Sequence, residues 1–126
     1  MAGLTYDSGA LIVAERNDRR FWAIHIRAME RGVLPVAPTV VLAQAWRGGP
    51  QPSLARLLQG CWIEPLSEPI ARQAGLALAL SRTSDVPDAT IVISASQRLD
   101  AVVTSDRADI EMVAQALNWH PNIIDI

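Results

Sequence analysis

The sequence predicts an α/β fold, a three-layer α/β/α sandwich built on a parallel sheet. Short apolar runs of strand length alternate with longer segments of helical periodicity along the whole chain. No internal repeat, linker or low-complexity segment interrupts this alternation. Strands that alternate with helices favour crossover connections, which place helices on both faces of a parallel sheet.

Five segments are predicted to be strands because each is a short apolar run bounded by a turn or by a helical pattern. Pro35 interrupts the second of them. In chain order, the predicted strands are residues 4–7, 33–37, 61–66, 101–104 and 122–126.

Seven segments are predicted to be helices from their apolar spacing and from the residues at their ends. Ser53 and Ser67 are the expected N-caps of two of them, and Gly32 is expected to end another. The Gly- and Pro-rich stretch 48–52 is a loop. In chain order, the predicted helices are residues 8–15, 20–31, 38–46, 53–60, 67–81, 87–98 and 107–117.

Composition limits the classes of protein that this chain can be. With 126 residues, half of them hydrophobic, it is expected to form one domain, residues 1–126, with a buried core. The net charge of −2 points to neither a nucleic acid nor a membrane. The chain has no lysine, and arginines crowd the first helical region, where they either form a solvated helix face or bind an anion. These are Arg16, Arg19, Arg20, Arg27 and Arg31.

Cys61 is the only cysteine, so an internal disulfide is excluded and a reducing, cytoplasmic location is expected. The first residues lack the basic start and long apolar core of a signal peptide. No apolar run reaches the roughly 18 residues that span a bilayer, so no membrane partner is expected.

Aspartates stand near the ends of two predicted strands. Asp7 ends the first strand and Asp106 follows the fourth, while Asp85 and Asp88 lie at the start of the sixth helix. Because the carboxyl ends of parallel strands share one edge of the sheet, these side chains are expected to gather in one pocket. An oxygen-rich pocket suits Mg²⁺ or Mn²⁺, which would remove the repulsion between the carboxylates.

Helix capping is the alternative explanation for each of these aspartates. Asp7, Asp85 and Asp106 stand just before predicted helices, where a carboxylate can accept hydrogen bonds from free amide groups. Asp88 and Asp109 fall in first turns, where a negative charge is favoured. Capping explains each residue separately, but it does not explain why they would gather at one edge.

The residues needed by other hydrolytic mechanisms are absent or poorly placed. His25 lies in the middle of a helix and His120 precedes Pro121, so both are expected to be structural. Nothing in the pattern supplies a base for Cys61, and there is neither a Walker-type phosphate loop nor a GxGxxG sequence. The remaining prediction is metal-assisted hydrolysis of a phosphodiester.

Three segments, Tyr6–Leu11, Asp85–Ala89 and Val103–Asp109, resemble in order and spacing the signature of PIN domains. Their order and spacing match the small VapC-type toxins of bacterial toxin–antitoxin pairs, and the resemblance spans nearly the whole chain. The resemblance implies a five-stranded parallel sheet and a Mg²⁺- or Mn²⁺-dependent ribonuclease. It also implies an RNA substrate, inhibition by a small cognate antitoxin, and a homodimer.

The resemblance further implies roles for individual residues. Asp7, Asp88 and Asp106 match the first, third and fourth acids of the family site, and are implied to be catalytic and to bind the metal. The remaining matches are Asp85, as a further metal ligand, and the accessory residues Asp109, Thr104 and Ser8.

Gln44 departs from the family pattern. It stands where the family usually has its second acid, a glutamate on the helix after the second strand. A glutamine offers a carbonyl oxygen but no charge, which weakens the attraction for a cation. The hypothesis for this chain is that Asp85 supplies the missing carboxylate.

Three other functions are compatible with a small α/β domain of this kind. A receiver domain needs a lysine, which this chain lacks, and a haloacid-dehalogenase-type phosphatase needs a second aspartate that Asp7-Ser8-Gly9 does not supply. The stronger rival is a PIN fold that has lost its second acid and binds RNA or an antitoxin without cleavage.

An antitoxin commonly lays an apolar helix into a groove. The candidate groove residues are Trp22, Met29 and Trp46, with core packing as the alternative for each.

Overall fold

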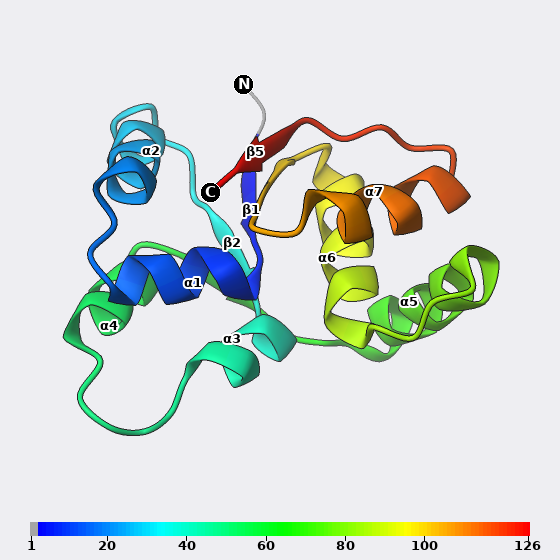
Figure 1. Ribbon diagram of the computed structural model, residues 1–126, viewed down its shortest axis with the longest axis horizontal. Helices are drawn as coiled ribbons and strands as arrows, with labels where there is room; N and C mark the ends of the chain where they lie inside the picture. The colour runs from blue at the N-terminus through cyan, green and yellow to red at the C-terminus, as the bar shows by residue number, and fades with distance from the viewer. Residues whose placement is uncertain (1–2) are drawn as a thin grey trace.

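The computed structural model describes residues 3–126, and its centre is a five-stranded sheet in which all strand pairs are parallel (Figure 1). The strands are β1 (Leu4–Tyr6), β2 (Val36–Pro38), β3 (Trp62–Glu64), β4 (Ala101–Thr104) and β5 (Ile123–Asp125). Their spatial order is β3-β2-β1-β4-β5. In the central strand, Thr5 pairs with Val36 of β2 on one side and with Val102 of β4 on the other.

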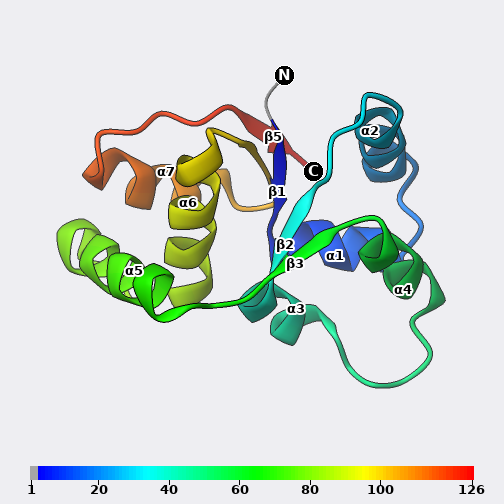
Figure 2. The ribbon, with the colours of Figure 1, turned by 180° about the vertical axis from the view of Figure 1, so that it is seen from behind.

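Helices cover both faces of this sheet (Figures 1 and 2). They are α1 (Ser8–Glu15), α2 (Arg19–Glu30), α3 (Thr39–Ala45), α4 (Pro52–Gln59), α5 (Glu68–Ser81), α6 (Val86–Arg98) and α7 (Arg107–Ala116). The group α1, α2 and α4 lies on one side, and the group α5, α6 and α7 lies on the other. The predicted three-layer α/β/α sandwich with a parallel sheet is therefore confirmed.

The middle of the sheet is buried on both faces. Every residue of β1 and β4 is buried. Helix α6 packs against β1, β2 and β4 with an unbroken buried run from Ala89 to Ala95. Strands covered on both faces are apolar throughout rather than alternating, which is why their short apolar runs were recognisable in the sequence.

Every helix and strand boundary lies within three residues of the predicted one, and two of the differences have a clear cause. The second strand was predicted from residue 33, but the Val33 amide donates to the Ala28 carbonyl at 2.9 Å and so belongs to the end of α2. The predicted N-cap role of Ser53 is wrong. Its hydroxyl donates to Asn17 Oδ1 at 2.8 Å, and α4 starts one residue earlier, at Pro52.

His25 is structural, as predicted. It is buried in α2, and its Nδ1 lies 2.8 Å from the Tyr6 hydroxyl in a hydrogen bond between α2 and β1. Burial lowers the pKa of His25, so the neutral imidazole is the favoured form. Its ring also packs edge-on against Trp22 in the preceding turn of the same helix, while the hydrogen bond to Tyr6 holds α2 against the sheet.

The three candidate groove residues differ in their burial. Trp22 is half-buried, and its indole N–H donates to the Ala14 carbonyl at 3.0 Å. Met29 and Trp46 are 50% and 43% exposed. Core packing therefore accounts for Trp22 but not for the other two.

None of the helices in residues 3–126 has the combination of length and apolar character that a membrane span requires.

Arg98, at the end of α6, compensates two buried carboxylates. Its Nε donates to Asp100 at 2.9 Å and its Nη1 donates to Glu64 at 3.0 Å. Nη2 donates to the hydroxyls of Thr5 and Ser94 at 3.2 and 2.8 Å. Glu64 and Asp100 are 5% and 4% exposed, so neither can be solvated if Arg98 is lost.

Replacing Arg98 by methionine is expected to lower the free energy of unfolding by about 3 kcal/mol, because two buried carboxylates lose their partner. The matched control is Arg72→Met, which removes an exposed i,i+4 pair with Glu68 and should cost at most about 0.5 kcal/mol. Urea denaturation of both variants measures the difference. Equal losses would show that the Arg98 network contributes no more than a surface ion pair.

Candidate functional site

Asp7 joins two elements at the carboxyl edge of the sheet. It follows β1 and is the N-cap of α1, where one carboxylate oxygen accepts the Ala10 amide at 2.8 Å. The other oxygen accepts the Thr104 hydroxyl and the Ser105 amide, both at the end of β4. Asp7 is 5% exposed. Its burial raises its pKa, whereas these hydrogen bonds act in the opposite direction.

Thr104 and Ser8 lie beside this carboxylate. Thr104 is fully buried at the end of β4, and its hydroxyl oxygen also accepts the Asp106 amide at 2.8 Å. Ser8 is half-buried at the first position of α1. The buried hydroxyl of Thr104 therefore connects the backbone of Asp106 to the side chain of Asp7.

Asp88 is a carboxyl group whose pKa is raised both by burial and by its charged neighbours. It lies half-buried in the first turn of α6, and its pKa is raised from 3.8 to about 7. Burial is the largest cause, and the negative charges of Asp85, Asp109, Asp106 and Asp7 add to it. These five carboxylates come from three separate parts of the sequence. Their mutual effect shows that the fold brings them within electrostatic range of one another.

A cavity of about 250 Å³ lies among the acidic residues between α6 and α7. Asp85, Asp88 and Asp109 line it together with Thr83 and Met112. Asp106 lies beside this group, and its pKa is raised mainly by a hydrogen bond with the Asp109 side chain. We refer to Asp7, Asp85, Asp88, Asp106 and Asp109 as the acidic cluster.

Helix capping explains some members of the acidic cluster and not others. Asp7 caps α1, and Asp85 caps α6 by accepting the Asp88 amide at 2.9 Å. Asp106 occupies the N-cap position of α7, but its side chain makes no capping hydrogen bond there. Because the Asp106 carboxylate is exposed and makes no capping hydrogen bond, helix capping does not explain its position.

Gln44 lines a different cavity from the one bordered by Asp85, Asp88 and Asp109. It is exposed on α3 and shares this cavity with Ile12, Glu15 and Arg47.

Gly9 and Ser105 were not anticipated from the sequence. A Cβ atom at Gly9 would lie 2.1 Å from the Ser105 hydroxyl oxygen and 2.8 Å from its Cβ, so only glycine permits the approach of α1 to the end of β4. The signal in the sequence was a glycine in the first turn of a predicted helix. Because glycine destabilises a helix, its presence there indicates a position where a larger residue would not fit.

Cys61 has no role in this site. It is half-buried next to β3, and burial raises the pKa of its thiol to about 12, so it remains protonated and unreactive at neutral pH.

No protein-family model and no curated protein sequence matches the chain. Among solved structures, it is similar to a chain of the FitAB complex bound to an IR36 DNA fragment, with a TM-score of 0.60 and 14% sequence identity. The similarity covers 97% of this chain and 94% of that one. FitB is a PIN-domain toxin of the VapC family. The chain has a PIN-like fold. The fold implied by the resemblance in sequence is thereby confirmed.

The chemistry of the acidic cluster fits a divalent cation. All of its donors are carboxylate oxygens, which Mg²⁺ and Mn²⁺ prefer, and a cation would offset the repulsion that raises the pKa of Asp88. Within residues 3–126, however, no three His, Cys, Asp or Glu side chains lie close enough together to hold a metal ion. Binding would therefore have to draw these carboxylates closer together.

Gly9→Ala is expected to destabilise the protein by about 1–3 kcal/mol, because the added methyl group must displace Ser105 from α1. The matched control is Gly75→Ala in α5, where the added Cβ meets nothing within 4 Å. Helix propensity predicts that this control gains about 0.5–1 kcal/mol. Urea denaturation gives both values, and a neutral or stabilising Gly9→Ala would contradict the close approach.

Asp88→Asn is expected to raise the melting temperature of the metal-free protein at pH 8. The pKa of Asp88 is raised to about 7 in the folded protein, so the folded state holds a proton that the unfolded chain releases near pH 4. The stability of the wild-type protein therefore falls between pH 4 and pH 7. The asparagine variant cannot ionise, so its advantage should shrink as the pH falls below 7 and disappear below 4. Melting curves across this range test the prediction, and a variant less stable than wild type at pH 8 would refute it.

Proposed function

We propose that this chain is a metal-dependent endoribonuclease and the toxin of a toxin–antitoxin pair. The observation that supports the proposal is the gathering of Asp7, Asp88 and Asp106 at the carboxyl edge of a PIN-like sheet. Open α/β sheets bind their ligands at this edge. A group of carboxylates that raise one another's pKa opposes stability, so its presence favours a role in binding a cation.

In this proposal Asp7, Asp88 and Asp106 hold Mg²⁺ or Mn²⁺, with Asp85 as a further ligand and Asp109 beside them. The bound ion would supply a Lewis acid that polarises the phosphodiester and lowers the pKa of water. The hydrogen bonds from Thr104, Ser105 and Ala10 fix the position of the Asp7 carboxylate. Asp88, with a pKa of about 7, is suited to accept or release a proton at neutral pH.

The proposed partners are an RNA substrate and a small cognate antitoxin, and the chain is proposed to act as a homodimer in the cytoplasm. The FitAB complex supports the antitoxin, because the similar protein there is bound together with a second protein on DNA. The exposed Met29 and Trp46 side chains are proposed to contact an antitoxin.

A second candidate function is a PIN-like module that binds RNA or an antitoxin without cleavage. The observation that favours it is Gln44, an uncharged side chain that lines a different cavity from the one among the aspartates. The two functions differ in one measurable property, which is hydrolysis of bound RNA.

The wild-type protein is expected to cleave a structured RNA only when Mg²⁺ or Mn²⁺ is present. Asp106→Asn and Asp88→Asn should each lower the rate by about 100-fold or more, because each removes a carboxylate from the proposed site. Asp106 is exposed and its side chain caps no helix, so its loss should leave the fold intact. Gel analysis of the cleavage products, with and without EDTA, measures the rate.

The matched control is Glu68→Gln, which makes the same acid-to-amide change at an exposed carboxylate on α5 that is not part of the acidic cluster. It should cleave at the wild-type rate. A wild-type protein that binds RNA without cleaving it would favour the binding module. Cleavage that survives Asp88→Asn and Asp106→Asn would place the active site elsewhere.

A further inference from the structure

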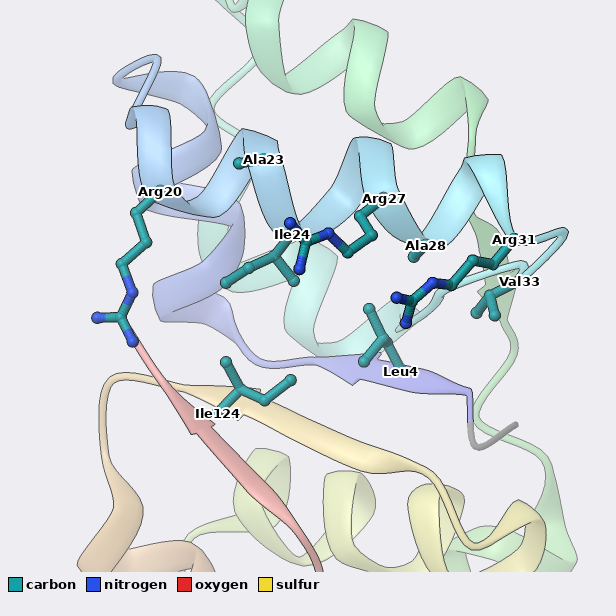
Figure 3. A pocket seen from close by; sticks show the side chains of 9 residues that line it. All are labelled: Leu4, Arg20, Ala23, Ile24, Arg27, Ala28, Arg31, Val33 and Ile124. Carbon is teal, nitrogen blue, oxygen red and sulfur yellow. The ribbon is translucent and has the colours of Figure 1, made fainter.

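A hollow of about 400 Å³ lies between α2 and the side of the sheet formed by β1 and β5, and none of the acidic cluster lines it. Its interior is apolar, with Leu4 of β1 and Ile124 of β5 facing Ile24 of α2 (Figure 3). Ala23 and Ala28 also line it, and these small side chains leave the space open. The volume lies within the range of sites that bind ligands, roughly 300–1,000 Å³.

The hollow exists because α2 is held through its other face. Phe21 and His25 are buried against Tyr6, with ring centroids 5.1 and 5.9 Å from the Tyr6 ring. These contacts hold α2 over β1 and leave the side that faces β5 without a covering element. The interior of the hollow is therefore apolar surface that no element of residues 3–126 fills.

Three arginines form a row along the hollow. Arg20, Arg27 and Arg31 lie with Ile24 on one face of α2, at positions i, i+7 and i+11, and their side chains extend along the opening (Figure 3). Among the ion pairs of residues 3–126, none involves these three arginines. Arg20 also stands in the first turn of α2, where the helix dipole disfavours a positive charge, so helix stability does not explain its position.

The spacing of the three arginines and the residues that line the hollow indicate which class of ligand would bind there. Eleven residues of helix extend about 16 Å, so the row is too long for one anionic head group and suits a chain that carries several carboxylates. The hollow is lined by aliphatic side chains and contains no aromatic ring on which a base could stack, which disfavours single-stranded RNA. Aliphatic or aromatic side chains of a peptide fit this interior.

We propose that this hollow binds an acidic peptide segment of a partner protein. The segment inserts one or two apolar side chains between Ile24, Leu4 and Ile124, and its carboxylates pair with Arg20, Arg27 and Arg31. Arginine suits these contacts because its planar guanidinium pairs with a carboxylate through two hydrogen bonds. The proposal concerns a binding surface and does not require the chain to be a nuclease.

The test is a selection of displayed random peptides on the full-length wild-type chain, followed by affinity measurements on synthetic copies of the enriched peptides. We expect enrichment of sequences in which Asp or Glu flank Leu, Ile or Phe. Arg27→Gln should weaken their binding by about tenfold, since a charged pair at the rim is lost. Ala23→Trp should also weaken it, because the large ring fills the hollow while residue 23 remains on an exposed face. Arg72→Gln, on exposed α5, is the control and should leave binding unchanged.

Backbone amide NMR spectra of each variant separate a local effect from loss of the fold. The proposal is overturned if no acidic peptide is enriched, or if the enriched peptides bind Arg27→Gln and Ala23→Trp as tightly as wild type. It is also overturned if these substitutions abolish binding of an RNA oligonucleotide and leave the peptides unaffected. Conversion of a dimer to a monomer by Ala23→Trp in sedimentation would instead assign the surface to a second copy of the chain.

Discussion

The carboxylate of Asp7 ties the first strand and helix of the chain to the fourth strand. It accepts hydrogen bonds from the start of α1 and from the end of β4, which are separated by nearly a hundred residues. Gly9 is required for this contact because a larger residue would collide with Ser105. The Thr104 hydroxyl that donates to Asp7 also accepts a hydrogen bond from the Asp106 amide. The position of Asp106 in the acidic cluster therefore depends on this junction.

The two groups of clustered carboxylates differ in whether an arginine pairs with them. Glu64 and Asp100 are buried and share Arg98, which satisfies both with hydrogen bonds. The ion pairs within residues 3–126 include no member of the acidic cluster, although the cluster carries five aspartates. Arg98 neutralises Glu64 and Asp100, whereas no arginine in the described part of the chain forms an ion pair with the acidic cluster, which therefore remains a negatively charged site. Such a site is suited to a cation that is not part of the chain.

Positive charge is likewise concentrated on α2, where Arg20, Arg27 and Arg31 take part in none of the ion pairs of residues 3–126. Arg20 nevertheless adds to the effect of Arg107 in lowering the pKa of Asp125. The arginine row of α2 borders an apolar hollow, while the acidic cluster occupies the carboxyl edge of the sheet. The small net charge of −2 thus conceals two surfaces of opposite sign. One suits a divalent cation and the other suits an anionic chain, so partners of different chemistry could occupy them without competing for the same residues.

The sequence by itself determined the features that depend on neighbouring residues. The alternation of strands and helices, the helix over residues 8–15, the strand over 101–104 and the cap at Ser67 all follow from local spacing and from hydrogen bonds within one turn. The gathering of aspartates at one edge was also predictable, because parallel connections place strand ends together.

Only the tertiary structure decided which side chains meet. The Asp106 side chain makes no capping hydrogen bond, Ser53 binds Asn17 rather than its own helix, and Gln44 lines a different cavity from the one among the aspartates. The Arg98 network and the hollow beside α2 join residues far apart in the chain. Such contacts depend on how helices rest on the sheet, which is set by long-range packing rather than by the residues adjacent in sequence.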